Sequence, residues 1–372
     1  MTEMAESMRF GILGCGMMGR EHIRNLQLTG AEVAVIAEPD AAMKSKASEL
    51  APEAVLVDSA EELLNASQLD ALVIATPNYQ HADQLLQIFA SSELPILIEK
   101  PLVTSIEQVS IIRQAAAAYP APVWVGMEYR YMPVIGNFRQ QLNDGAVGEL
   151  VMLSIREHRY PFLKKVGDWN RFNKNTGGTL VEKCCHFFDL MRLLVSDEPA
   201  RVMASAGQDC NHLNEEYDGQ RPDILDSAFV IVDFKSGKRA MLDLSMFAQG
   251  SRYEQEICVV GSKGKLECLI PGPRALWGDR QAPTRVVLSP RRPVGPVESE
   301  TEVDPAILAA GSHNGSTYYE HLGFRDAILG NGPVEVGVED GLKAVVMGMA
   351  AQESARSGQA IELTDEGYGF NH

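Results

Sequence analysis

Phe10-Gly11-Ile12-Leu13-Gly14-Cys15-Gly16-Met17-Met18-Gly19 joins an apolar strand pattern to the motif G-x-G-x-x-G, and a helical pattern follows it. In such a motif the first glycine, Gly14, allows a tight strand-to-helix turn, and the second, Gly16, lets the backbone approach a pyrophosphate. The third, Gly19, lets the helix pack closely on the strand. The first helical N–H groups then face the phosphates, with the positive end of the helix dipole behind them. The stretch therefore predicts a dinucleotide-binding turn.

An acidic residue follows the second predicted strand, residues 31–37. Glu38 stands about where this motif places the carboxylate that binds the ribose hydroxyls. A carboxylate there repels the 2′-phosphate of NADP, and no Arg follows within residues 39–42; Lys44 and Lys46 lie farther along. The alternative is a plain glycine turn followed by a solvated glutamate. We favour NAD as the cofactor. The residues expected to contact it here are Gly14, Gly16, Met17, Met18, Gly19 and Glu38.

Length and composition limit the classes of function that this chain can have. A chain of 372 residues predicts two domains, and 45% hydrophobic with 22% charged residues is typical of a globular protein. The formal net charge of −17 disfavours nucleic acid and anionic membranes as partners. The six cysteines are scattered without metal-ligand spacing, so we expect reduced thiols, a cytoplasmic location and no metal. The first seven residues lack the apolar core of a signal peptide, and the apolar runs are too short to span a bilayer.

Strand and helix patterns alternate through the first third of the chain. Continuous apolar strands separated by amphipathic helices predict a parallel sheet covered on both faces, a doubly wound Rossmann domain in residues 1–126. Ligands of such a sheet bind beyond the carboxyl ends of its strands. After the glycine motif, strands are predicted at 31–37, 54–57, 70–75, 94–98 and 122–126. Helices are predicted at 22–28, 41–50, 60–64, 81–91 and 106–119.

The pattern changes from about Glu149 onward, where longer alternating runs appear. They predict a C-terminal α+β domain, residues 127–372, with a large, mostly antiparallel open sheet that serves substrate binding and oligomerisation. One face of this sheet would lie on helices and the other on solvent or a partner subunit, so we expect a homo-oligomer, a dimer or tetramer. We expect residues 271–305 to be irregular. Helices are expected at 317–329 and 339–357.

Three polar signals follow predicted strands of the first domain. They are Thr76-Pro77-Asn78 with His81, Glu99-Lys100-Pro101, and Arg130-Tyr131-Met132-Pro133. A lysine at a strand end beside a nicotinamide can hydrogen-bond a substrate oxygen and stabilise the charge that develops on it. An isolated E-K-P would be an ordinary surface loop, but the fold context favours a functional Lys100. Thr76, Pro77, Asn78, His81, Glu99 and Lys100 are therefore added to the predicted cofactor-binding residues.

A double glycine, Gly177-Gly178, precedes a second constellation on an expected amphipathic helix. Leu180, Cys184, Phe187 and Met191 follow helical spacing and should face the core. Glu182 and His186 stand at i and i+4, and Asp189 stands three residues after His186, so the three share one helical face. A carboxylate beside an imidazole raises its basicity and fixes its orientation. The alternative is a casual pair on a solvated face, but the dinucleotide motif makes His186 a candidate general base.

In order and spacing, these elements resemble the Gfo/Idh/MocA oxidoreductases, which include glucose–fructose oxidoreductase and inositol dehydrogenases, over nearly the whole chain. The resemblance implies that Lys100 is the family lysine and His186 the catalytic histidine. Glu182 stands where Asp is usual, with the same charge on a longer arm. It also implies NAD-dependent oxidation of a secondary alcohol of a sugar or cyclic polyol. Two alternatives stay open: a redox-neutral, NAD-using sugar lyase or glycosidase of the same family, and a non-catalytic dinucleotide-binding regulator.

The segment 156–176 combines aromatic and polar side chains suited to a sugar ring and its hydroxyls. Lys164, Lys165 and Arg171 in it leave room for an anionic sugar, and packing of the segment or subunit contacts are the alternative for any single residue. The predicted substrate-binding residues are Arg130, Tyr131, Tyr160, Trp169, Asn170 and Asp189. His212, Asp223, Asp226 and His313 are further polar candidates.

Overall fold

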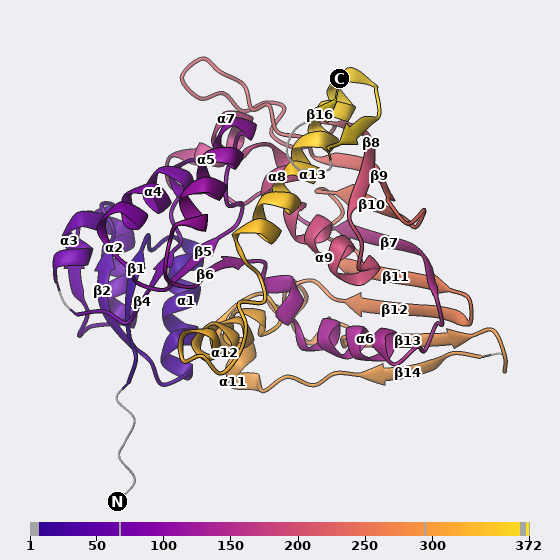
Figure 1. The fold of residues 1–372 in the computed structure, drawn as a ribbon, viewed down its shortest axis with the longest axis horizontal. Helices are drawn as coiled ribbons and strands as arrows, with labels where there is room; N and C mark the ends of the chain where they lie inside the picture. Colours follow the sequence, from indigo (N-terminus) through magenta and orange to yellow (C-terminus); the bar gives the residue numbers. More distant parts are fainter. Residues whose placement is uncertain (1–6, 67, 294, 365–369, 372) are drawn as a thin grey trace, which may run out of the picture.

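The computed structural model describes residues 7–66, 68–293, 295–364 and 370–371. In this part the chain forms two units side by side (Figure 1). One is a parallel sheet with helices on both faces, and the other is a broad sheet with helices packed against it.

The first unit is a six-stranded parallel sheet in the order β3-β2-β1-β4-β5-β6. Its strands are β1 Arg9–Leu13, β2 Glu32–Ala37, β3 Val55–Val57, β4 Ala71–Ile74, β5 Ile96–Glu99 and β6 Val123–Gly126. Its helices are α1 Met17–Leu28, α2 Ala41–Leu50, α3 Ala60–Ala66, α4 His81–Ser91 and α5 Ile106–Ala117. The central strands are buried along nearly their whole length, which confirms the predicted doubly wound sheet. The order reverses at β1, so the glycine turn lies at the topological switch point.

The second unit contains a ten-stranded sheet in the order β14-β13-β12-β11-β7-β10-β9-β8-β15-β16. Of its described pairings only β7 with β10 is parallel, so the sheet is mostly antiparallel as predicted. Its strands are β7 Leu150–His158, β8 Pro199–Gly207, β9 Ser227–Phe234, β10 Arg239–Ser245, β11 Gln255–Gly261, β12 Gly264–Ile270, β13 Arg285–Pro290, β14 Val297–Glu300, β15 Ile361–Leu363 and β16 Phe370–Asn371. Burial alternates along β9 and β10, so one face packs on helices and the other is exposed.

The remaining helices connect or cover these sheets. They are α6 Pro133–Asn143, α7 Asn173–Thr176, α8 Thr179–Glu182, α9 Cys185–Val195, α10 Arg274–Trp277, α11 Pro305–Ala310, α12 Ser316–Ile328 and α13 Val338–Ser357. The 3-10 turns are η1 Asn78–Gln80, η2 Glu128–Tyr131, η3 Val166–Arg171 and η4 Gly278–Arg280.

Two expectations about secondary structure were wrong. Residues 271–305 are not irregular throughout, because they contain β13 and β14, which extend the sheet beyond β12. The strand conformation of β13 depends on pairing with β12 and that of β14 on pairing with β13, and the exposed edge strand β14 carries little apolar alternation that could reveal it. The helix expected after Gly178 is interrupted at Lys183-Cys184 and forms α8 and α9 instead.

Helix α12 returns to the first unit although it belongs to the last quarter of the chain. Phe324 lies 6.4 Å from the ring of Phe10 and 6.1 Å from that of Trp124. The backbone N–H of Val125 in β6 donates to the carbonyl of Val336 at 3.0 Å. A boundary at residue 126 therefore separates the two sheets, whereas α12 lies spatially with the first of them.

The described part of the chain contains no helix that is both long and apolar enough to cross a membrane. The six cysteines of that part are all free thiols. The cytoplasmic location inferred from their spacing stays a prediction.

Candidate active site

The three motif glycines are constrained in different ways. Gly14 has φ +89°, and a Cβ there would lie 2.8 Å from the carbonyl oxygen of Ala75. A Cβ on Gly19 would lie only 2.0 Å from the carbonyl oxygen of Gly14, so the helix packs directly on the turn. A Cβ on Gly16 would meet no described atom within 4 Å. Packing therefore requires glycine at positions 14 and 19, whereas packing does not explain the glycine at position 16.

The amino end of α1 and Glu38 fit a bound dinucleotide. In the described structure no side chain caps α1, and no acidic residue lies in its first turn, so its N–H groups remain available to an anion. Glu38 is buried beside the turn, where Oε2 accepts a hydrogen bond from the N–H of Cys15 at 2.7 Å and Oε1 accepts from Asp40 N–H at 2.9 Å. Its carboxylate is thus held next to Gly14 and Gly16, as ribose recognition requires.

Thr76, Pro77 and Asn78 lead from β4 into η1, directly beside the glycine turn. The N–H of Ala75 donates to the carbonyl of Leu13 at 2.8 Å, which ties the two segments together. The Thr76 hydroxyl donates to Oε1 of Gln84 at 2.5 Å. The side-chain nitrogen of Asn78 is buried and has no hydrogen-bond partner among the described residues. The cofactor contacts predicted for this segment stay predictions, and its position is compatible with them.

Lys100 follows β5 and reaches across to the second unit. Its Nζ donates to the carbonyl oxygen of Glu182 at 3.1 Å, at the end of α8. Burial works against the charged form of this lysine. Cys185, Glu99, Glu182 and the more distant Glu128 outweigh burial and raise the pKa of the Lys100 ammonium above its ordinary value. Lys100 is therefore a positively charged side chain, fixed at the junction of the two units by its hydrogen bond to the carbonyl of Glu182.

His186 in α9 lies on the other side of this junction. Its ring stacks on Tyr129 with centroids 4.2 Å apart and an interplanar angle of 5°. Its Nε2 lies 4.0 Å from Oε1 of Glu128, and its buried Nδ1 has no hydrogen-bond partner among the described residues. Burial, together with the charge of Lys100 and then Lys183, lowers the pKa of His186 well below its ordinary value. The imidazole is therefore neutral near pH 7.

Comparison with known proteins identifies the family. A model described as the NAD-binding Rossmann fold of the Gfo/Idh/MocA oxidoreductase family matches residues 8–127, and that of the family's C-terminal alpha/beta domain matches residues 139–363. An inositol 2-dehydrogenase of Rhizobium meliloti (strain 1021) is 33% identical over 261 residues, 69% of this chain and 74% of that protein. One from Arthrobacter sp. (strain FB24) is 30% identical over 286 residues, 75% of this chain and 80% of that protein.

The chain belongs to the Gfo/Idh/MocA oxidoreductase family. Its first unit is the NAD-binding domain of that family. The solved structure of levoglucosan dehydrogenase in complex with NADH and levoglucosan shares the fold, with a TM-score of 0.79 at 19% identity over 96% of this chain and 99% of that one.

No described contact joins Glu182 to His186. The charges that lower the pKa of the buried Glu182 carboxylate include those of Lys100 and Lys165, whereas Nε2 of His186 lies 4.0 Å from Oε1 of Glu128. Burial nevertheless raises the pKa of Glu182, and its Oε2 lacks a hydrogen-bond partner in the described structure. The expected Glu182–His186 pair is therefore absent among the described contacts.

Asp189 and Arg130 bind one another. The guanidinium of Arg130 donates twice to the carboxylate of Asp189, through Nη2 and through Nε at 2.5 Å, and its Nη1 donates to the carbonyl of Glu335 at 3.0 Å. Both side chains are buried, so the structure does not support the substrate contacts predicted for them. Tyr131 likewise packs against Trp124 in the core, with ring centroids 5.7 Å apart.

Two other predicted residues are also used by the protein itself. His81 is fully buried, with its ring nitrogens 2.8 Å from the carbonyl oxygen of Pro101 and 3.0 Å from that of Thr76. It braces the loops after β4 and β5 against each other, so a cofactor contact is not supported. Asn170 is buried too, and its amide donates to the carbonyl of Leu163 at 3.0 Å. Sequence alone cannot tell whether a polar residue in a loop stabilises the loop or contacts a ligand, because its neighbours are known only from the fold.

The side chain of Glu99 is engaged within the protein, so a cofactor contact is not supported for it. Its Oε1 lies 3.0 Å from Nε2 of His22, and Nδ1 of His22 lies 3.0 Å from Nε2 of His321. Burial opposes ionisation of Glu99, but the bond from His22 and the charges of His22 and Lys100 lower its pKa below the ordinary value. Glu99 therefore connects the lysine loop to α1 and α12.

Trp169 and Tyr160, the other two aromatic residues predicted to bind substrate, contact different parts of the protein. Trp169 packs edge-on against Tyr79, with centroids 6.0 Å apart, beside the loop after β4. The ring of Tyr160 lies under the guanidinium of Arg159 at 4.3 Å and lines a small cavity with His313 and Glu254. A substrate contact for these two residues stays a prediction.

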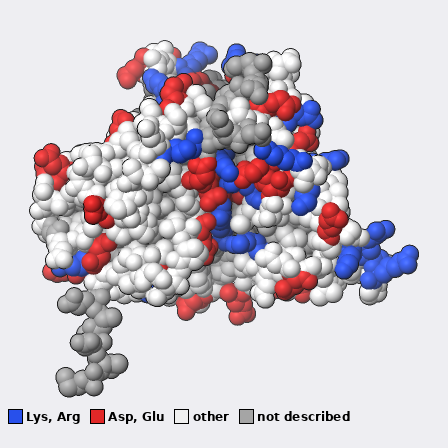
Figure 2. Space-filling model, viewed as in Figure 1, with Lys and Arg blue, Asp and Glu red and all other residues white. Residues whose placement is uncertain are grey.

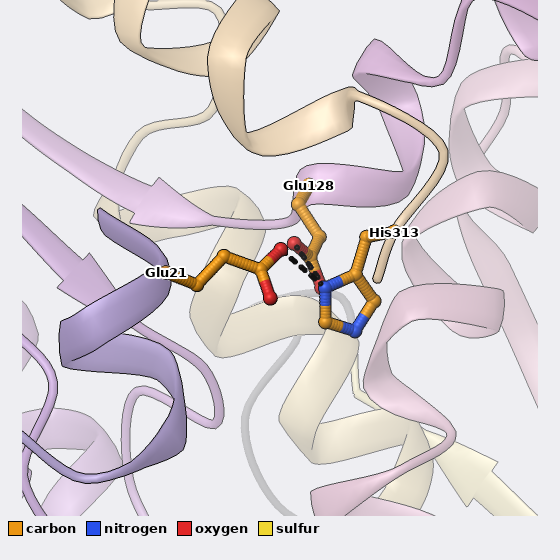
Figure 3. Close-up of side chains that lie close together, drawn as sticks. All are labelled: Glu21, Glu128 and His313. Carbon is orange, nitrogen blue, oxygen red and sulfur yellow. Dashed lines mark hydrogen bonds and ion pairs between the residues drawn. The ribbon is translucent and has the colours of Figure 1, made fainter. Parts of the chain in front are cut away.

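Sequence reasoning named His313 as a polar candidate but missed the group that it forms with two buried glutamates at the junction (Figure 3). Glu21 comes from α1, Glu128 from η2 and His313 from the loop before α12, and their ligand-type atoms all lie within 4.8 Å of one another. Burial opposes the charge on His313, but Glu128 and Glu21 raise its pKa to about 9. The signal that could have indicated Glu128 is its place just beyond the carboxyl end of β6.

Lysine, arginine, aspartate and glutamate side chains of both signs gather where the two units meet (Figure 2). Inside the junction the mixture continues: Lys183 is buried, lies 2.9 Å from Oε1 of Glu157 and donates to the hydroxyl of Tyr129 at 2.5 Å. Buried charges near Lys100 and His186 are thus paired with one another.

Proposed function

We propose that this protein oxidises a secondary alcohol of a sugar or cyclic polyol with NAD⁺, with Lys100 and His186 at the reacting oxygen. The observation that carries the proposal is the pairing of a charged lysine with a neutral imidazole at the junction of the two units. Lys100 comes from the NAD-binding unit and His186 from the other, and Lys100 is the charge that most lowers the pKa of that imidazole after burial.

The two groups have complementary chemical tasks. His186 can accept the hydroxyl proton, because a neutral imidazole has a lone pair on one of its two ring nitrogens. The ammonium of Lys100 can donate to the same oxygen and stabilise the negative charge that develops as the proton leaves. NAD⁺ bound at the glycine turn supplies the hydride acceptor.

The substrate class is supported by the relatives. Two proteins that share about a third of their residues with this chain over most of its length are named inositol 2-dehydrogenases. The departure at Glu182, whose carboxylate faces Lys100 and Lys165, leaves the identity of the sugar or polyol and of the oxidised carbon to experiment.

The test is nicotinamide reduction by the purified protein over a panel of inositols, sugars and sugar acids. His186→Ala should lower turnover by roughly 10²–10⁴-fold while NAD binding, followed by fluorescence, survives. Lys100→Met should lower kcat and kcat/KM together. Unchanged turnover in either variant would contradict the assigned roles. Substrate consumed without net reduction would favour the redox-neutral alternative, and NAD binding without any turnover would favour the regulator.

A homo-oligomer, formed through the outer face of the large sheet, is proposed on separate grounds. Met203, Ile231 and Met241 lie directly opposite one another across β8, β9 and β10, and all three are exposed. Phe229 on the same face of β9 is 61% exposed. A continuous exposed apolar row marks an interface. Phe229→Lys should lower the mass measured by light scattering, whereas Ile111→Lys on α5 should not; a wild-type monomer would refute the proposal.

A further inference from the structure

The adenosine side of the cofactor site contains a guanidinium that the sequence after Glu38 does not reveal. No arginine follows Glu38 within residues 39–42. Arg20 stands instead directly after the last motif glycine, in α1, and its side chain returns to the glycine turn. Its role there concerns the choice of cofactor and does not depend on the proposed alcohol oxidation.

The contacts of Arg20 place it beside the carboxylate of Glu38. Nη1 of Arg20 donates to the carbonyl oxygen of Cys15 at 2.8 Å and lies 3.2 Å from Sδ of Met43, in the first turn of α2. The N–H of the same Cys15 donates to Oε2 of Glu38 at 2.7 Å. The guanidinium and the carboxylate therefore flank one residue of the turn, and Arg20 reaches the segment that follows Glu38 from the preceding helix.

The charges of both side chains act on the thiol of Cys15. Burial, and after it the charge of Glu38, raise the pKa of this thiol to about 12, whereas Arg20 opposes the rise. A carboxylate and a guanidinium thus lie close to the same buried atom. No ion pair joins Arg20 to Glu38 among the described residues, so the guanidinium is not bound by that carboxylate.

The guanidinium of Arg20 has hydrogen-bond donors to spare. A guanidinium presents its N–H groups in a planar fork that matches the oxygens of a phosphate. The described hydrogen bonds of Arg20 use Nη1 alone, so Nε and Nη2 have no partner among the described residues. The residue is only partly buried. Unused donors beside a ribose-binding carboxylate are what the 2′-phosphate of NADP requires.

Acidic neighbours limit how tightly a phosphate can bind there. Asp40 is the N-cap residue of α2, and its N–H donates to Oε1 of Glu38 at 2.9 Å. Lys44, the next cation along the chain, forms an ion pair with Asp58. Two carboxylates and one guanidinium therefore lie near the expected position of the ribose, and NAD stays the preferred cofactor.

We propose that Arg20 is a second determinant of cofactor choice, which binds the 2′-phosphate of NADP and lets the protein accept NADP beside its preferred NAD. The phosphate is carried by the ribose 2′-oxygen, the atom that Glu38 is expected to bind in NAD. The unused donors of Arg20 hydrogen-bond the phosphate oxygens, and its charge offsets part of the repulsion from Glu38. The nicotinamide halves of the two cofactors are chemically identical, so the choice is made at the adenosine side alone.

The first test is equilibrium binding of NAD⁺ and NADP⁺ to the purified protein, without substrate, followed by calorimetry. The wild type should bind both cofactors, NAD⁺ more tightly. Arg20→Met should weaken NADP⁺ binding about 10–100-fold more than NAD⁺ binding, because charge-assisted hydrogen bonds to the phosphate are lost. Arg20→Lys should keep part of the NADP⁺ affinity, since the charge remains without the fork.

Arg24→Met is the matched control for these variants. Arg24 lies one turn farther along α1, and its guanidinium likewise donates to a backbone carbonyl, that of Ala310, at 2.8 Å. Its loss should leave the ratio of the two affinities unchanged. A parallel loss of NAD⁺ and NADP⁺ affinity in Arg20→Met would overturn the proposal, because Arg20 would then only support the glycine turn.

The second test separates the phosphate from the rest of the cofactor. Adenosine 2′,5′-bisphosphate and adenosine 5′-monophosphate differ in the 2′-phosphate alone, so Arg20→Met should weaken binding of the first much more than that of the second. Glu38→Ala should tighten NADP⁺ binding, and adding Arg20→Met should remove that gain. Undetectable NADP⁺ binding in both the wild type and Glu38→Ala would also overturn the proposal, whatever the protein oxidises.

Discussion

Replacing Asp189 by Asn should unfold this protein far more readily than the same change at Asp233. Both aspartates receive two hydrogen bonds from one arginine, Arg130 for Asp189 and Arg201 for Asp233. They differ in exposure: Arg130 and Asp189 are 8% and 1% exposed, whereas Arg201 and Asp233 are 51% and 36% exposed. The two sites therefore form a matched comparison within one chain.

The magnitude follows from what remains after each change. Asp189→Asn removes the counter-charge that makes two bonds to the buried guanidinium of Arg130, and leaves it the carboxylate of Asp340, 3.8 Å from Nη2, and the carbonyl of Glu335, which still accepts one bond. Removing one partner of a buried pair costs about 3–5 kcal/mol, and we expect the lower end because the amide oxygen retains one acceptor. Exposed pairs contribute about 0–1 kcal/mol. The expected difference is therefore about 2–3 kcal/mol, against a total stability of roughly 5–15 kcal/mol.

The assay is urea unfolding of both variants and the wild type, followed by tryptophan fluorescence and by circular dichroism. If both probes give coincident transitions, the change in midpoint measures the change in unfolding free energy. A loss below about 1 kcal/mol in Asp189→Asn would refute the argument that this pair is a structural tie. A normal stability with a raised substrate KM would instead restore the substrate contact first expected of Asp189.

Gly19→Ala should destabilise the fold by about 1–3 kcal/mol, because its Cβ would lie 2.0 Å from a carbonyl oxygen. Gly16→Ala should leave the thermal midpoint unchanged but weaken NAD binding measured by titration. Equal thermal midpoints for the two variants would contradict this. Glu38→Ala should narrow the preference for NAD over NADP in binding measurements, and an unchanged ratio would refute its role. The pKa of His313 is raised to about 9 from 6.5, so its stabilisation is complete below pH 6.5 and lost as pH rises through about 9. Urea midpoints should fall over that window in the wild type but not in His313→Gln.

Much of the NAD-binding unit could be predicted because local patterns specify it. Continuous apolar strands, glycines at fixed offsets and one acidic residue after the second strand each reflect a constraint that acts within a few residues. The edge strand β14 and the break between α8 and α9 could not be predicted in the same way. The first depends on pairing with β13, and the second on the backbone bonds and neighbours around Lys183-Cys184.

By itself the sequence determined the architecture of the first unit, and it indicated Lys100 and His186 as candidate catalytic residues. Only the tertiary structure decided which partner each charged side chain takes: Glu128 for His186, Arg130 for Asp189, Lys100 and Lys165 for Glu182. The physical reason is that burying a charge is costly, so its partner is whichever opposite or hydrogen-bonding group the fold brings within a few ångströms. Those groups come from η2, the loop after β5 and the segment before η3, which sequence spacing cannot relate.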